Sequence, residues 1–207
     1  MKKEYLSHPI ERAIAFILKV HGGESDKGGN PYLLHPLSVA VGIRDPEVQI
    51  AAVLHDTIEK GATEEELRSE TGASKRSVHI VSAVSMVGPV PTDDDEYLRF
   101  YERYVVQLLE AGREDVGVLV LKTSDVSNNL DLSRIERPTP WDLSRNSRYQ
   151  DVFVRCVERL FEVEEANIRD LLEHGDASVL EKHYVPERVG FLAELYRKTR
   201  RALETER

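Results

Sequence analysis

The chain of 207 residues is poor in cysteine and lacks long apolar runs. Its one cysteine, Cys156, cannot form an internal disulfide, which excludes a disulfide-stabilised secreted domain. Cys156 lies in an apolar segment of helical period, which favours a buried core residue over a nucleophile. The apolar segment 13–20 is short and contains Lys19, so it predicts neither a membrane span nor an export signal. We therefore expect a cytoplasmic protein without a membrane partner.

Positive charge is also scarce, because 28 basic residues face 37 acidic ones and the formal net charge is -9. Such a chain lacks the basic footprint that a long nucleic acid requires. A small phosphate ester can still bind, since a metal ion and a few local lysine or arginine residues are enough. Hydrophobic residues make up 41% of the chain, and no repeat, low-complexity tract or long linker divides it. We expect one domain over residues 1–207.

The hydrophobic pattern has a helical period along most of the chain and predicts an all-α fold. Thr63 and Glu66 form a capping box, which marks the start of one helix. Arg137 to Pro140 carries two prolines and interrupts the pattern. We expect a helical bundle of about eight to ten helices, with helices over 10–21, 33–43, 46–56, 63–72, 74–86, 96–111, 116–132, 144–173 and 178–205.

Three separate segments carry residues that could bind a metal. His55 and Asp56 follow the apolar run 50–54, His35 precedes a proline, and Asp125 lies in a helical pattern. A histidine and a carboxylate at the end of an apolar run are costly unless both are paired, and a divalent cation pairs both. Two imidazole nitrogens and two carboxylates suit Mn, Fe or Zn better than Ca, and they do not exclude Mg. Water on such an ion would become a hydroxide nucleophile near neutral pH.

Each of these residues also has a plain structural interpretation. A histidine-aspartate pair is often a surface hydrogen bond, His35 could pack at a helix start, and Asp125 could be a charge on a helix face. Taken together and in this order, the four residues are better explained by one shared metal ion.

These motifs resemble the hydrolase domain of the RelA/SpoT-type alarmone hydrolases, especially the small stand-alone members. The resemblance covers residues 21 to about 161. It implies an all-helical HD domain that binds Mn²⁺ and removes the 3′-pyrophosphate from ppGpp and pppGpp. The motifs that carry it are His21-x-Gly23, Lys27, Gly29-x-Pro31-Tyr32-x-x-His35-Pro36, Ala51-Ala52-x-Leu54-His55-Asp56-Thr57-x-Glu59, Lys122-x-x-Asp125-x-x-x-Asn129 and Thr139-Pro140.

The resemblance also implies a role for each matching residue. The metal ligands would be His35, His55, Asp56 and Asp125. Glu59 would belong to the acidic pair that positions the attacking water; as an alternative, it could be a surface residue at a helix end.

Four further residues would bind the substrate by the same resemblance. Lys27 would face it, Asn129 would contact the nucleotide, and Arg145 with Tyr149 would line the nucleotide pocket. The structural alternatives are that Asn129 caps a kink and that Tyr149 belongs to the core.

The sequence departs from the family at three positions. Lys60 replaces the second acid of the pair, Asp26 replaces an arginine that lies near the base, and Val126 replaces the arginine after the metal aspartate. A lysine is no base at neutral pH unless its pKa is strongly lowered, but it can bind a phosphate, so we expect Lys60 to contact the substrate.

Three functions are therefore compatible with the sequence. The first is alarmone 3′-pyrophosphate hydrolysis, and the second is an HD phosphohydrolase that acts on a different nucleotide or dinucleotide phosphate. The third is a metal- and nucleotide-binding sensor with little turnover, for which Lys60 is the main support. The sequence leaves the base, the metal and the oligomeric state open.

Overall fold

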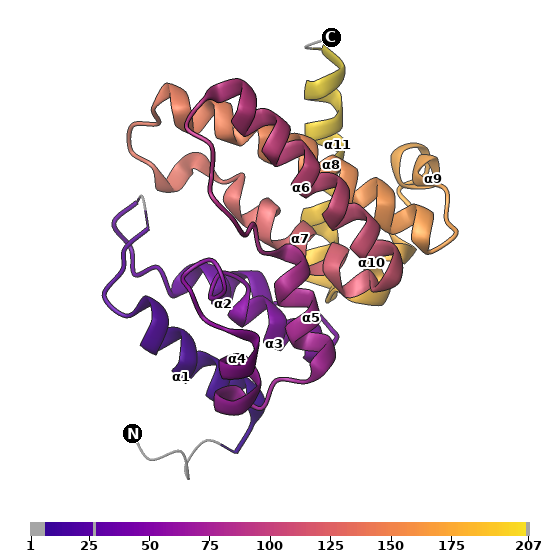
Figure 1. The fold of residues 1–207 in the computed structure, drawn as a ribbon. Coiled ribbons are helices and arrows are strands. Elements are labelled where there is room, and N and C mark those ends of the chain that lie inside the picture. Colours follow the sequence, from indigo (N-terminus) through magenta and orange to yellow (C-terminus); the bar gives the residue numbers. More distant parts are fainter. Residues whose placement is uncertain (1–6, 27, 206–207) are drawn as a thin grey trace.

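The computed structural model describes residues 7–26 and 28–205 and is built from α-helices (Figure 1). These residues form eleven α-helices and no β-strand, so the all-α prediction is confirmed and the helix count exceeds the predicted range by one. The helices are α1 (Pro9–His21), α2 (Leu34–Ala40), α3 (Pro46–Leu54), α4 (Glu64–Thr71), α5 (Lys75–Val84), α6 (Asp94–Glu114), α7 (Val116–Asn129), α8 (Pro140–Val163), α9 (Ile168–Glu173), α10 (Ser178–His183) and α11 (Pro186–Thr205), with a 3-10 turn at Leu132–Arg134.

Nine helices were expected by range and eleven are found among the described residues, because both of the predicted C-terminal helices are divided. The one expected over 144–173 ends at Val163, and Glu165 then takes a positive φ of 55°, which stops α8 before α9 begins. The one expected over 178–205 is divided at Tyr184, which is extended, and Pro186 begins α11.

The helix that precedes the His55-Asp56 pair also ends earlier than predicted. It was expected to run through Asp56, but α3 ends at Leu54. The reason is Thr57, whose backbone N–H and hydroxyl both donate to the Leu54 carbonyl, at 3.0 and 2.6 Å. This tight turn closes α3 and places His55 and Asp56 just beyond it.

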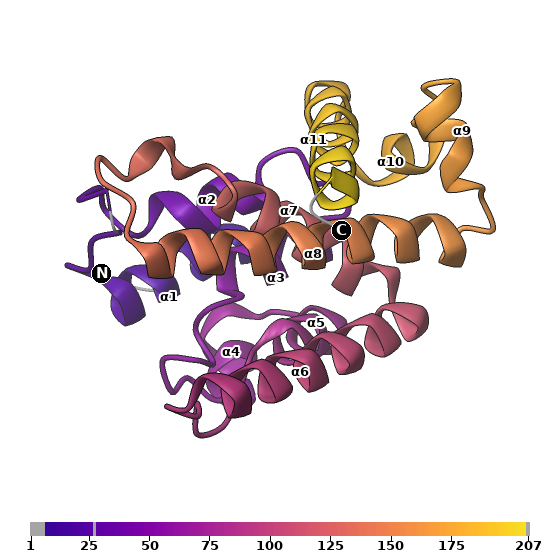
Figure 2. The same ribbon diagram turned by 90° about the horizontal axis from the view of Figure 1, so that it is seen from above.

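The hydrophobic core is centred on α3 and α7. Ala51, Ala52 and Leu54 of α3 are fully buried, and α7 packs against α2, α3, α5, α6 and α8. The two longest helices, α6 and α8, contact each other, and in Figure 2 α8 crosses the middle of the view with α6 below it. Gly117 allows α7 to approach α3 and α5, because a Cβ there would lie 2.9 Å from Val48 and 2.8 Å from Ile80. The candidate metal ligands thus come from the ends of tightly packed helices.

Polar contacts fix both ends of α7. At its start, Arg76 of α5 contacts Asp115 at 2.7 Å and Asp45 at 2.6 Å, which joins the first turns of α3, α5 and α7. Near its end, Arg188 of α11 donates to Ser124 Oγ and Ser127 Oγ, both at 2.9 Å. These contacts hold α7 in a fixed position relative to α3.

Two expectations about apolar segments are tested by the structure. Cys156 is fully buried in α8, and burial raises the pKa of its thiol to about 12, which supports a core role. Within residues 7–26 and 28–205, no helix combines the length and the hydrophobicity needed to cross a membrane.

Candidate metal centre

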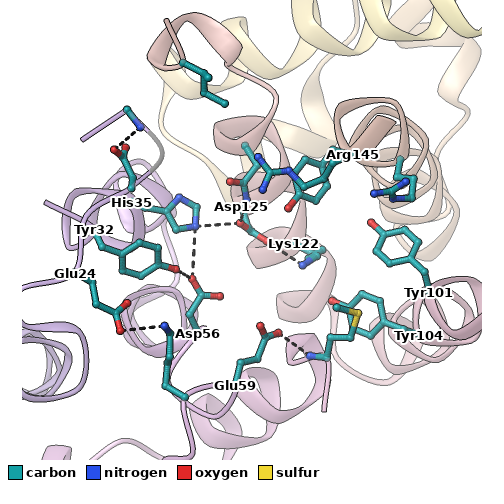
Figure 3. A pocket seen from close by; sticks show the side chains of 18 of the residues that line it. Glu24, Tyr32, His35, Asp56, Glu59, Tyr101, Tyr104, Lys122, Asp125 and Arg145 are labelled. Carbon is teal, nitrogen blue, oxygen red and sulfur yellow. Dashed lines mark hydrogen bonds and ion pairs between the residues drawn. The ribbon is translucent and has the colours of Figure 1, made fainter. Parts of the chain in front are cut away.

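His35, His55, Asp56 and Asp125 come together from three segments of the chain. Figure 3 shows three of them, His35, Asp56 and Asp125, pointing toward one another. His35 lies in the first turn of α2, His55 and Asp56 follow α3, and Asp125 lies on α7. His35 Nε2 is 3.3 Å from Asp125 Oδ1, and His55 Nε2 is 3.1 Å from Asp56 Oδ1. His35 Nε2 also lies 3.8 Å from Asp56 Oδ2, and His55 Nε2 lies 3.7 Å from Asp125 Oδ1.

The two imidazole rings are oriented by hydrogen bonds on their far sides. His35 Nδ1 lies 2.8 Å from Asn128 Oδ1, and His55 Nδ1 lies 2.8 Å from the Ala52 carbonyl. Both partners are carbonyl oxygens, so each Nδ1 must donate, and Nε2 is the atom that can bind a metal. His55 Nε2 is buried and, within residues 7–26 and 28–205, has Asp56 Oδ1 nearby but no hydrogen-bond partner of suitable geometry. The side chains present therefore fit a divalent ion.

The donor atoms are close enough to share one ion. One atom each from His35, His55 and Asp125 lies within 4.8 Å of the other two, and all three residues are buried. Asp56 lies beside them, where the Tyr32 hydroxyl donates a hydrogen bond to its Oδ2. Two imidazoles and two carboxylates, the four side chains that the sequence predicts as metal ligands, thus lie close together, and their role as ligands stays a prediction.

Asp125 is held by two neighbours on its own helix. Lys122 Nζ donates to Asp125 Oδ2 at 2.9 Å, and Asn129 Nδ2 donates to Oδ1 at 2.6 Å. Burial opposes the charge on Asp125, but the Lys122 ammonium outweighs it and holds the pKa of this carboxyl well below its usual range. Oδ1 therefore stays ionised and faces the histidines.

The electrostatics of His55 follow from the same carboxylates. Burial disfavours the charged imidazolium, yet Asp56 and Asp125 outweigh that cost and raise the pKa of His55 to about 9. A metal ion that binds at neutral pH would replace this proton.

Glu59 lies in the turn between α3 and α4 and faces the same cavity. Its Oε1 accepts a hydrogen bond from the Met86 backbone N–H at 2.8 Å. Burial raises the pKa of Glu59 above its ordinary value. A carboxylate with a raised pKa beside a metal centre suits proton transfer.

Lys60 is paired with a residue that sequence reasoning did not connect to it. Its Nζ lies 3.0 Å from Glu24 Oε1, and the other oxygen of Glu24 lies 3.2 Å from His21 Nδ1. The Lys60 side chain is 47% exposed at the mouth of the cavity. The positive charge at position 60 is thus matched by an acid from the loop after α1.

A cavity of about 430 Å³ opens above the metal ligands, a volume within the range of small-molecule sites. Most residues expected to bind substrate line it, and Asp26 does as well. Lys27 lies outside the described residues. The expected residues in the lining are His35, Asp56, Glu59, Lys60, Asp125, Asn129, Arg145 and Tyr149.

The far wall of the cavity was not predicted. It includes Tyr97, Tyr101 and Tyr104 of α6 and Arg148 of α8, and Lys122, which lies between Asp125 and Tyr104, also lines the cavity. The three tyrosines recur at i, i+4 and i+7, which places them on one face of a helix. That spacing was the signal available in the sequence.

The comparisons with known proteins agree with this geometry. The family model for the HD domain matches residues 13–160, which is well over half of the chain. The chain belongs to the HD domain family. An HD domain implies a divalent metal, and the structure contains a buried histidine-aspartate cluster that could hold one.

The relatives are named as alarmone enzymes. The chain is 34% identical over 143 residues to the guanosine-3′,5′-bis(diphosphate) 3′-pyrophosphohydrolase MESH1 of Mus musculus, covering 65% of this chain and 74% of that protein. It is 34% identical over 126 residues to a guanosine-3′,5′-bis(diphosphate) 3′-pyrophosphohydrolase of Aquifex aeolicus, covering 58% of this chain but only 17% of that larger protein. The resemblance found in the motifs is confirmed.

Proposed function

We propose that the protein is a metal-dependent phosphohydrolase that removes the 3′-pyrophosphate from ppGpp-like alarmones. The observation that carries this proposal is the buried group of His35, His55 and Asp125 at the floor of a nucleotide-sized cavity. The names of the MESH1 and Aquifex relatives support the substrate.

In this proposal the ion is held by Nε2 of His35 and His55 and by the carboxylates of Asp56 and Asp125. Manganese is our choice, with iron, zinc or magnesium as alternatives. The bound metal would supply an acidified water and polarise a phosphoryl oxygen. Asp125 would ligate through Oδ1, because this oxygen lies nearest Nε2 of both histidines, at 3.3 and 3.7 Å, while Oδ2 accepts from Lys122.

Glu59 would position the attacking water and accept its proton. Its position in the cavity lining and its raised pKa support this role, because a base with a pKa closer to neutrality transfers protons more efficiently. Substrate contacts are assigned to Lys60, Arg145 and Tyr149, which all line the cavity. Asn129 would contact the nucleotide beside its hydrogen bond to Asp125, and Lys27 remains a prediction.

A different nucleotide or dinucleotide phosphate is the second candidate substrate. The departures at Asp26 and Lys60 favour it, since both residues line the cavity and Asp26 places an acid where the family carries an arginine. A metal-dependent nucleotide sensor with little turnover is the third candidate. We also propose one domain over 1–207, a cytoplasmic location and no long nucleic acid partner; the oligomeric state stays open.

The test is a screen of nucleotide phosphates with the Mn²⁺-loaded protein, scored for phosphate and for pyrophosphate. We expect ppGpp to yield GDP and pyrophosphate in equal amounts. Phosphate release from another nucleotide, with ppGpp intact, would support the second candidate. Tight nucleotide binding without any product would support the sensor.

A further inference from the structure

Among the described residues that line the cavity, every positively charged side chain but one has a carboxylate partner. Four lysine and arginine side chains line the cavity among the described residues, and three of them have a carboxylate partner. Lys60 pairs with Glu24 at 3.0 Å, Lys122 with Asp125 at 2.9 Å, and Arg145 with Asp142 at 3.4 Å. The fourth, Arg148, has no carboxylate partner within the described part of the chain.

The Arg148 guanidinium is nevertheless held in place. It lies over the Tyr97 ring, 5.2 Å from the centroid, and Tyr97 stacks on Tyr101 with 6.1 Å between ring centroids. Its Nη1 donates to Ser144 Oγ at 2.9 Å. Stacking and one hydrogen bond orient the guanidinium without neutralising it.

One N–H of Arg148 also lacks an acceptor. Nε is buried and has no hydrogen-bond partner within residues 7–26 and 28–205. A buried donor without an acceptor is unfavourable unless a ligand or water meets it. A planar guanidinium whose charge is not matched suits a phosphate, which it can bind with two parallel hydrogen bonds.

The wall that holds Arg148 faces the metal centre across the cavity. Figure 3 shows Tyr101 and Arg145 on the side opposite Tyr32, His35 and Asp56. A substrate with its scissile phosphate at the metal would therefore direct its remaining part toward this wall.

We propose that Arg148 binds a second phosphate group of the substrate, remote from the scissile one, and so selects nucleosides that carry phosphates at both ends. This rests on the proposed function and deepens it. For ppGpp, the group at Arg148 would be the 5′-diphosphate. Tyr97 acts as a positioning residue, since it touches Arg148 and orients it.

The experiment compares two substrates that differ only at the 5′ end, ppGpp and guanosine 3′-diphosphate. A charged hydrogen-bonding partner contributes enough that Arg148→Met should raise the KM for ppGpp by roughly 10- to 100-fold. The KM for guanosine 3′-diphosphate should stay unchanged, as should kcat on both. Arg148→Lys keeps the charge and should recover part of the loss. The matched control is Arg155→Met on the same helix, whose guanidinium pairs with Glu102 at 2.8 Å and which is absent from the cavity lining.

An equal rise in KM for both substrates, or no rise for either, would overturn the proposal. If the wild-type protein hydrolyses neither substrate, the proposed function fails. The role of Arg148 is then tested separately by measuring ligand binding. Titration calorimetry with GDP and with guanosine on the Mn²⁺-loaded protein serves this purpose. Weaker binding of GDP alone in Arg148→Met supports the second-phosphate site, and identical GDP affinities overturn it.

Discussion

Lys122→Met removes the ammonium that pairs with Asp125 while keeping a side chain of similar length. The Lys122 side chain is only 13% exposed, and its Nζ lies 5.5 Å from the centroid of the Tyr104 ring. In the metal-free protein the change leaves a buried carboxylate without its main partner, which costs about 3–5 kcal/mol in comparable cases. We take roughly 3 kcal/mol, the lower end of that range, because His55 Nε2 lies 3.7 Å from Asp125 Oδ1 and can carry a compensating charge.

Lys122→Met should destabilise the metal-loaded protein less than the metal-free protein. A divalent ion beside Asp125 compensates its charge, so the lost hydrogen bond should cost only about 1 kcal/mol. For a chain of this size each kcal/mol lowers the melting temperature by about 2–4 °C. We therefore expect a drop of about 6–12 °C in the metal-free protein and of about 2–4 °C in the loaded one.

The assay is thermal melting with excess Mn²⁺ and with chelator, for the wild type and for Lys122→Met. The control is Lys19→Met, whose lysine pairs with Glu70 at 2.8 Å but is 60% exposed. It should change neither melting temperature appreciably, because exposed ion pairs contribute little. An equal drop for Lys122→Met with and without metal would refute the reasoning, because the lysine would then stabilise the packing and not the charge of Asp125.

Three further predictions concern other parts of the molecule. His55→Ala and Asp56→Ala should each lose bound metal, as measured by elemental analysis; full metal content in both would contradict the ligand assignment. Glu59→Gln should lower kcat by about 10²–10⁴-fold with metal content unchanged. Burial raises the pKa of Glu59 above 4.5, so the base form and the activity should be lost as the pH falls through that raised pKa, and the variant should lack this acidic limb. Burial opposes the charge on Asp115, but the hydrogen bond from Arg76 outweighs burial and lowers the pKa of this carboxyl. The ionised Asp115 therefore stabilises the fold at neutral pH, and this stabilisation is lost as the pH falls through the lowered pKa. Asp115→Asn should thus reduce the free energy of unfolding by about 1–2 kcal/mol at pH 7 and by much less under strongly acidic conditions, as measured by urea denaturation; an equal loss at both pH values would contradict it.

Several features of this protein could be predicted from the sequence because they depend on neighbours in the chain. Helical periodicity defined the all-α class, and the capping box of Thr63 and Glu66 does begin α4. The grouping of His35, His55, Asp56 and Asp125 was also anticipated, because isolated buried polar groups are too costly to leave unpaired. Their roles as metal ligands stay a prediction until metal binding is measured.

The divided C-terminal helices could not be predicted in the same way. The pattern over 178–205 stays apolar at helical spacings, yet Tyr184 leaves the helix and is fully buried. Its hydroxyl donates to the Val120 carbonyl at 2.6 Å, and its backbone faces Ile43 in an isolated bridge. These partners are 64 and 141 residues away in the sequence, so no local sequence pattern predicts that the helix is interrupted at Tyr184.

The sequence alone therefore determined the helical class and the family, and it predicted the set of candidate metal ligands, since each follows from local periodicity or from short motifs. Only the tertiary structure decided how charges are matched around the cavity. It paired Lys60 with Glu24, assigned Lys122 to Asp125, and left Arg148 without a carboxylate among the described residues. The physical reason is that an ion pair depends on distances of 3–4 Å between side chains, and folding sets those distances between segments that the sequence keeps far apart.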